Sequence, residues 1–138
     1  MIIEDAPLDE WLSTLKPYQS ISISQMAADT GEEEAAKNWL SANGPSSTVG
    51  FGGTSNPEPF YERFMEEFRK LICGDEAYEE IRAQLGAESA IAKTIYVSVI
   101  STALGATLGY TATLLAPAVA ILLHLIGKMS VNAWCAAS

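Results

Sequence analysis

The sequence predicts an all-α protein in which small amphipathic helices are packed around or precede an apolar C-terminal helical hairpin. Three observations predict this class. Apolar residues recur at three- and four-residue spacing along most of the chain, as they do in helices. Every Asp and Glu lies at or before Glu88. No Asp, Glu, Lys or Arg stands between Lys93 and Lys128. An acidic front half is therefore joined to a back half that must be shielded from water.

The net charge of the chain indicates which classes of binding partner to expect. The 138 residues carry 17 Asp and Glu against 8 Lys and Arg, a net charge of −9. Such a surface repels phosphate backbones, so we do not expect a nucleic-acid partner; a basic protein partner fits better. No basic segment precedes an apolar one at the start of the chain, so no signal peptide is predicted. We therefore expect a cytoplasmic location, with membrane association and cytoplasmic termini left open.

The two cysteines, Cys73 and Cys135, lie far apart in the sequence. In a reduced cytosolic protein such a pair is typical of two buried thiols, which is the favoured interpretation, with a disulfide as the alternative. Cys73 lies near the C-terminal end of a predicted helix, where the helix dipole disfavours a thiolate. It is therefore a poor candidate for a nucleophile.

Residues 1–42 are predicted to form an acidic helical head. A first short helix should end at Pro17, because proline disrupts a helix interior. Ser24 is a candidate N-cap for a second helix. Residues 20–42 then have the rhythm of a helix-turn-helix, but the second helix of this segment begins with three glutamates, which would repel DNA. Helix packing is the favoured interpretation, and a small regulator that uses residues 20–42 is the alternative function.

Residues 43–58 are rich in Gly, Ser and Pro and are predicted to be a linker. Residues 59–86 follow as an amphipathic helix pair. In its first helix, Glu66 and Lys70 form a favourable i,i+4 pair on the polar side. Asp75 is the predicted cap of the second helix. The apolar stripe of the first helix consists of Phe60, Phe64, Phe68 and Leu71.

Residues 88–138 are predicted to form the apolar hairpin. Its two helices are expected at about 88–109 and 116–135, since Pro117 is acceptable in a first helical turn but disruptive inside a helix. Small side chains recur along one face of each helix, and such seams let two helices pack closely. The residues assigned to packing or assembly are Ser98, Thr102, Gly105, Gly109, Ala116, Ala120, His124 and Gly127. The bulky face of the first helix, opposite its seam, consists of Val97, Ile100, Leu104 and Leu108.

This hairpin can be interpreted in two ways. Each half offers roughly the 20 apolar residues that a bilayer span needs. In that case Lys93, Lys128 and Trp134 would lie together at the membrane interface. The mid-helix position of His124 and the frequent hydroxyl side chains favour instead burial in a soluble core or an assembly. In outline, residues 88–135 resemble the hydrophobic hairpins that helical pore-forming toxins hide within a soluble bundle, although no motif specific to such a family is present.

The sequence contains no set of residues that predicts a catalytic, metal-binding or cofactor-binding site. His124 is the only histidine, and no carboxylate lies near it in the sequence. We therefore predict a buried neutral histidine, no metal, no cofactor and no enzymatic activity. The expected function is assembly of the hairpin with a protein partner or with itself, or its insertion into a membrane as an effector.

Overall fold

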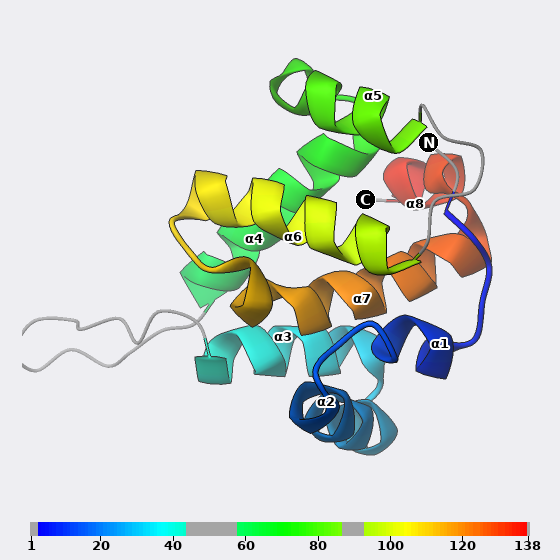
Figure 1. The fold of residues 1–138 in the computed structure, drawn as a ribbon, viewed down its shortest axis with the longest axis vertical. Helices are drawn as coiled ribbons and strands as arrows, with labels where there is room; N and C mark the ends of the chain where they lie inside the picture. Colours follow the sequence, from blue (N-terminus) through cyan, green and yellow to red (C-terminus); the bar gives the residue numbers. More distant parts are fainter. Residues whose placement is uncertain (1–2, 44–57, 87–92, 138) are drawn as a thin grey trace, which may run out of the picture.

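A computed structural model describes residues 3–43, 58–86 and 93–137 (Figure 1). Every regular element in these ranges is a helix, which confirms the predicted all-α class. The predicted linker at 43–58 lies almost entirely outside the described residues. In chain order the helices are α1 (Leu8–Leu12), α2 (Pro17–Thr30), α3 (Glu32–Asn43), α4 (Glu58–Cys73), the short 3-10 helix η1 (Glu76–Tyr78), α5 (Glu79–Gly86), α6 (Lys93–Leu108), α7 (Ala112–Met129) and α8 (Val131–Ala137).

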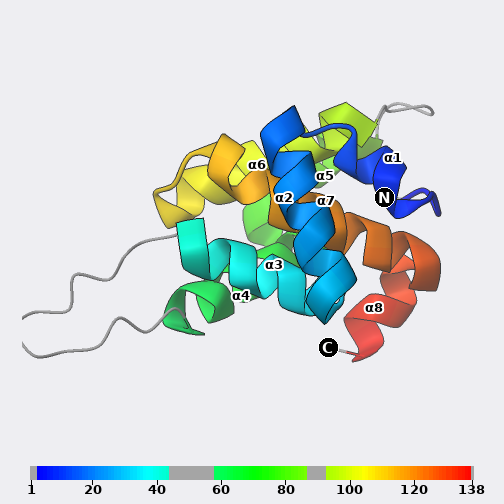
Figure 2. The same cartoon turned by 90° about the horizontal axis from the view of Figure 1, so that it is seen from below.

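Helix α7 is the centre of the bundle. In Figure 1, α6 runs along one side of it and α3 along the other. Helices α1, α2 and α8 also contact α7, and Figure 2 shows α2 crossing α3. Of the 18 residues of α7, 56 % are buried. The most apolar part of the chain is thus covered by its own amphipathic helices, because that arrangement removes the largest apolar area from water.

Helix α4 confirms the amphipathic pattern predicted for this segment. Its stripe of Phe60, Phe64, Phe68 and Leu71 is buried, and α4 packs against α3, α6 and α8. On its polar side the Lys70 Nζ atom lies 3.8 Å from Glu66 Oε1, as the spacing predicts. The cap is also in place, since the Ala77 backbone N–H donates to Asp75 Oδ1 at 2.9 Å.

Two prolines lie elsewhere in their helices than predicted. Pro17 does not end the first helix, which stops at Leu12, but occupies the first position of α2. The missing N–H of proline has no helical partner at that position, so it costs nothing there. Pro117 does not open the second apolar helix, which begins already at Ala112 and contains Pro117 in its interior. The predicted boundary near residue 116 is therefore wrong.

The expectation of two buried thiols is wrong. Cys73, at the end of α4, and Cys135, in α8, form a disulfide with a Cα–Cα distance of 5.8 Å. Cys73 is exposed rather than buried. The two residues are 62 positions apart, and only the packing of α8 against α4 brings them together. Next to the disulfide, the ring of Trp134 packs edge-on against Phe68 at 5.6 Å between centroids.

Candidate functional site at the apolar α6–α7 pair

Helices α6 and α7 lie side by side and run in opposite directions, joined by a short turn (Figure 1). Gly109 adopts a φ of +81°, a conformation that favours glycine. The N–H groups of Gly109 and Tyr110 both donate to the Gly105 carbonyl, at 2.8 and 2.9 Å. A Cβ atom on Gly105 would collide with the carbonyl oxygen of Tyr110. These two glycines therefore form the turn between the helices rather than a contact seam.

The packing face of α6 is its bulky face, not its small-residue face. The buried residues include Val97, Ile100, Leu104 and Leu108. Ser98 and Thr102 are exposed, so these two residues of the predicted seam do not face the core of this bundle. In water, burying aliphatic side chains contributes more than burying hydroxyls. In lipid, burying aliphatic side chains between helices has no such advantage, and small residues are enriched at helix–helix interfaces.

The α7 seam does not form a single contact with α6: Ala116 lies beside α6 residues, whereas His124 faces α3. Ala116, Ala120 and His124 follow one another at four-residue spacing and share a face. His124 on this face contacts Glu32, the first residue of α3. Ala35 and Ala36 of α3 are fully buried. Helix α3 therefore packs against α7 at the His124 end of this face.

Gly127, the last residue of the α7 seam, serves a different contact. A Cβ atom at this position would collide with the backbone carbonyl oxygen of Glu4. The N-terminal segment therefore crosses directly over α7 at Gly127. This crossing needs a residue without a side chain, which explains the glycine without reference to a helix partner.

A buried histidine–glutamate pair joins α7 to α3. The Nδ1 atom of His124 and the Oε1 atom of Glu32 are in direct contact, and neither has another hydrogen-bond partner. The His124 side chain is nearly inaccessible, whereas Glu32 also borders a surface hollow of about 450 Å³. Lys128 lies 3.9 Å from the other Glu32 oxygen. His124 thus has a carboxylate partner, 92 positions away, that its sequence neighbourhood did not reveal.

Two further side chains bind the backbone of α7. Pro117 has no N–H to donate to the carbonyl of Thr113 four residues earlier. The amide of Gln19, a buried residue of α2, donates to that carbonyl at 2.8 Å. The indole N–H of Trp39 donates to the Leu114 carbonyl, also at 2.8 Å. Side chains from α2 and α3 therefore satisfy carbonyls in the first turns of α7.

The three membrane-interface candidates are all engaged within the bundle. The ammonium of Lys93 lies 2.7 Å from a Glu4 carboxylate oxygen. Lys128 is near Glu32, and Trp134 packs against Phe68. Each of these groups therefore has a role in the folded bundle that does not require lipid.

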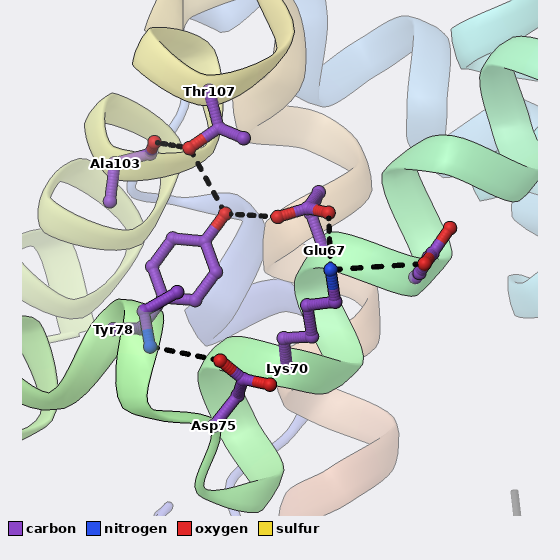
Figure 3. A network of polar contacts seen from close by, with 8 residues as sticks. Glu67, Lys70, Asp75, Tyr78, Ala103 and Thr107 are labelled. Atoms are coloured by element: carbon purple, nitrogen blue, oxygen red, sulfur yellow. Dashed lines mark hydrogen bonds and ion pairs between the residues drawn. The ribbon is translucent and has the colours of Figure 1, made fainter.

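A polar network holds α6 to α4 (Figure 3). The Tyr78 hydroxyl donates to Glu67 Oε1 at 2.7 Å and lies 3.0 Å from Thr107 Oγ1 of α6. Lys70 donates to the second Glu67 oxygen at 3.2 Å. Burial, and then the hydrogen bond to the Glu67 carboxylate, raise the pKa of Tyr78 to about 12.

Among the described helices, Ala112–Met129 is the one whose length and composition would allow it to cross a membrane. A buried core helix has the same properties, so this is weak evidence for a span. The described residues contain no cluster of His, Cys, Asp and Glu that could hold a metal ion. Comparison with protein-family models, with curated proteins and with solved structures found no match.

Sequence reasoning missed Glu32 and Gln19 as partners of α7. A signal for Gln19 existed, because a proline inside a helix leaves one carbonyl that needs a donor from outside the helix. No comparable signal pointed to Glu32, one of three consecutive glutamates at the start of its helix.

Proposed function

We propose that this protein is a non-enzymatic helical bundle that shields an apolar helix pair, α6–α7, and delivers it into a membrane. The observation that carries the proposal is the central position of α7, the most apolar helix, within a coat formed by the acidic and amphipathic helices. His124, the only histidine of the chain, contacts Glu32 inside the core.

The charge pattern supports tip-first insertion. The turn at 109–111 joins the two helices, and no charged side chain stands between Lys93 and Lys128. Insertion from this turn would leave both lysines on the side from which the pair entered. The small-residue face of α6, exposed in the bundle at Ser98 and Thr102, would then become a packing face, since lipid offers no advantage to the bulky one.

The disulfide supports action outside the cytoplasm. Disulfides persist in oxidising compartments and are rare in reduced cytosol, so Cys73–Cys135 favours export over the cytoplasmic location expected from the sequence. The bond also ties α8, directly after α7, to α4. The C-terminal end of the inserting pair would thus remain attached to the soluble helices.

A charge placed on the exposed face of α6 tests this proposal. Thr102 is exposed near the middle of α6, so Thr102→Asp should leave the soluble bundle intact. A carboxylate at the middle of a membrane helix costs about 2.5–3.5 kcal/mol. We expect wild-type protein to float with anionic phosphatidylglycerol vesicles and to release a trapped dye. Thr102→Asp should bind on the order of 100-fold more weakly.

The matched control is Ala83→Asp, which adds the same charge at an exposed position of α5, outside the pair. It should bind vesicles as wild type does. Wild-type protein that neither floats nor releases dye would overturn the proposal. Equal weakening by both substitutions would show that surface charge, not insertion, controls binding.

A second candidate, assembly with a protein partner or another copy, is supported by the outer face of α2. Tyr18 and Ile21 lie one turn apart and are each 61 % exposed, although exposed apolar residues are also common on monomers. Size-exclusion chromatography with light scattering tests self-assembly. A dimer that Ile21→Lys converts to monomer would support it, and a wild-type monomer at high concentration would count against it.

The regulator alternative has less support. Helix α3, which would read DNA, packs against α2, α4 and α7. Its exposed first-turn residues are Glu33 and Glu34, which repel phosphates. A mobility shift of duplex DNA by the protein at low salt would support the regulator alternative.

A further inference from the structure

A short non-helical segment, residues 3–7, leads into α1, and we call it the strap. In Figure 1 it passes the end of the bundle where α7 meets α8 and then enters α1. The side chains of Ile3 and Ala6 are buried against the bundle. Among the described residues, no backbone hydrogen bond joins residues 3–6 to another element. The strap is therefore held by packing and side-chain contacts, and it can lift without breaking a backbone hydrogen bond to its neighbours.

The strap touches α7 at the main chain. A Cβ atom at Gly127 would collide with the Glu4 carbonyl group and would lie 3.3 Å from the Asp5 Cα atom. These are backbone atoms, which cannot turn aside as the end of a flexible side chain can. Any side chain at residue 127 would therefore push the strap away from α7.

The strap also holds the first residue of α6. The ammonium of Lys93 lies 2.7 Å from Glu4 Oε2 and 3.3 Å from Glu10 Oε2. Glu10 belongs to α1, the helix that follows the strap. A lysine at the start of a helix is unfavourable, because the helix dipole is positive there, and the two carboxylates offset this charge. Glu4 thus contacts both helices of the pair, α7 through its carbonyl and α6 through its carboxylate.

These contacts fasten the open end of the α6–α7 pair, which we call its base. The two helices are antiparallel, so Lys93 and Gly127 lie at the same end, away from the turn at 109–111. The Glu4 side chain is 65 % exposed, and exposed ion pairs contribute little to stability. A segment with few buried side chains opens at a lower free energy than the whole bundle. The strap can therefore detach while the rest of the bundle stays folded.

We propose that the strap is an autoinhibitory element that keeps the α6–α7 pair in the bundle. While Glu4 lies against Gly127 and Lys93, the base of the pair is closed, and when the strap lifts, the base opens. Release of the strap also loosens α1, which packs against α7. Opening of the base in solution requires no membrane, whereas the control of insertion rests on the proposed function.

Gly127→Ala should lift the strap without weakening α7, since alanine is a better helix former than glycine. Hydrogen exchange followed by mass spectrometry, without lipid, measures the opening. We expect the amides of α6 and of residues 121–128 to exchange about tenfold faster than in wild type, and those of α4 to keep their rates. Gly86→Ala is the matched control, because a Cβ atom there meets no described atom within 4 Å. It should exchange as wild type does.

A second variant reaches the strap by a different route. Glu4→Gln/Glu10→Gln removes both carboxylates from the Lys93 ammonium and adds no volume, so it should fold. Exchange in α6 should be about threefold faster, the effect of a weak surface ion pair. The matched control is Asp5→Asn/Asp9→Asn, which removes the same charge at exposed positions of the strap and α1. It leaves the contacts of Lys93 in place and should exchange as wild type does.

Vesicles of anionic phosphatidylglycerol then test the control of insertion. Gly127→Ala should release a trapped dye about tenfold faster than wild type, and Gly86→Ala at the wild-type rate.

Three results would each overturn the proposal: wild-type exchange rates in α6 and α7 of both strap variants; equal acceleration in α4, which would mean a global loss of stability; or faster exchange without faster dye release, when wild type itself releases dye. If wild type and all variants release no dye, the proposed function fails, and the exchange rates alone decide whether the strap holds the pair.

Discussion

The two sides of α7 are held in different ways. On the α1–α3 side, contacts come from Glu32, Gln19 and Trp39, and all of them are non-covalent. On the α4–α8 side, a disulfide ties the helix that follows α7 to α4. The first side can therefore separate one contact at a time, whereas the second remains attached. If the α6–α7 pair leaves the bundle, we expect α1–α3 to separate from it first.

Among the changes to the two sides, removal of the disulfide should lower the free energy of unfolding most. A disulfide typically contributes about 2–4 kcal/mol to the free energy of unfolding, chiefly by restricting the unfolded chain. Urea denaturation of the double variant Cys73→Ser/Cys135→Ser should show a loss of this size. Wild type in reducing agent should behave like the double variant. Equal stability of reduced and oxidised wild type would mean that the bond does not hold the α4–α8 side.

The histidine–glutamate pair is a non-covalent contact on the α1–α3 side, and its loss should have the next largest effect. Glu32→Ala should lower the free energy of unfolding by about 1–3 kcal/mol, because it leaves the buried Nδ1 of His124 without a partner. Glu33→Ala removes the same charge from the same helix start at an exposed position, and should change stability by less than about 0.5 kcal/mol. Equal losses would assign the effect to the helix dipole instead.

The Gln19 contact allows a double-mutant cycle. Gln19→Leu leaves the Thr113 carbonyl without its donor and should cost about 1–2 kcal/mol. In a Pro117→Ala background the restored backbone N–H can bond to that carbonyl, so the same change should cost less. Gln25→Leu, at an exposed position of α2, is the control. If the two substitutions had additive effects, the backbone N–H of residue 117 would not replace the Gln19 amide as the donor to the Thr113 carbonyl.

The smallest expected effect concerns the Tyr78 network at high pH. The pKa of Tyr78 is about 12 in the folded protein against 10.0 for a free tyrosine. Because the folded state favours the protonated form, this contribution to stability is present below pH 10 and is lost as pH rises through about 12. The loss should reach about 1 kcal/mol by pH 11. The Tyr78→Phe variant should not lose this stability at high pH. Parallel pH profiles of stability for wild type and the variant would contradict the contribution of Tyr78.

The parts of the fold that could be predicted depend on local pattern. The stripe of α4, the cap at Asp75 and the Glu66–Lys70 pair all involve residues within four positions of each other, where spacing alone determines the contact. The start of α7 was misplaced because Pro117 is tolerated inside the helix once Gln19 bonds to the freed carbonyl. That partner lies 94 positions away.

The candidate site was predictable as a segment but not as a set of contacts. Residues 94–127 stood out by their lack of charge, yet the seam assigned to α6–α7 packing divides between the turn, solvent and α3. Gly105 and Gly109 form the turn, Thr102 is exposed, and His124 faces α3. Side-chain size alone does not show which neighbour a helix face will meet.

The sequence by itself determined that this chain is helical and where its water-avoiding part lies, because periodicity and charge are local properties. The tertiary structure decided what covers that part: α3 packs on one side of α7, and the bulky face of α6 is turned inward. It also decided the chemical partners of His124, Thr113 and Cys73, each more than 60 positions distant. Such contacts depend on how whole helices share one core, since total buried area, rather than any single spacing, selects the arrangement.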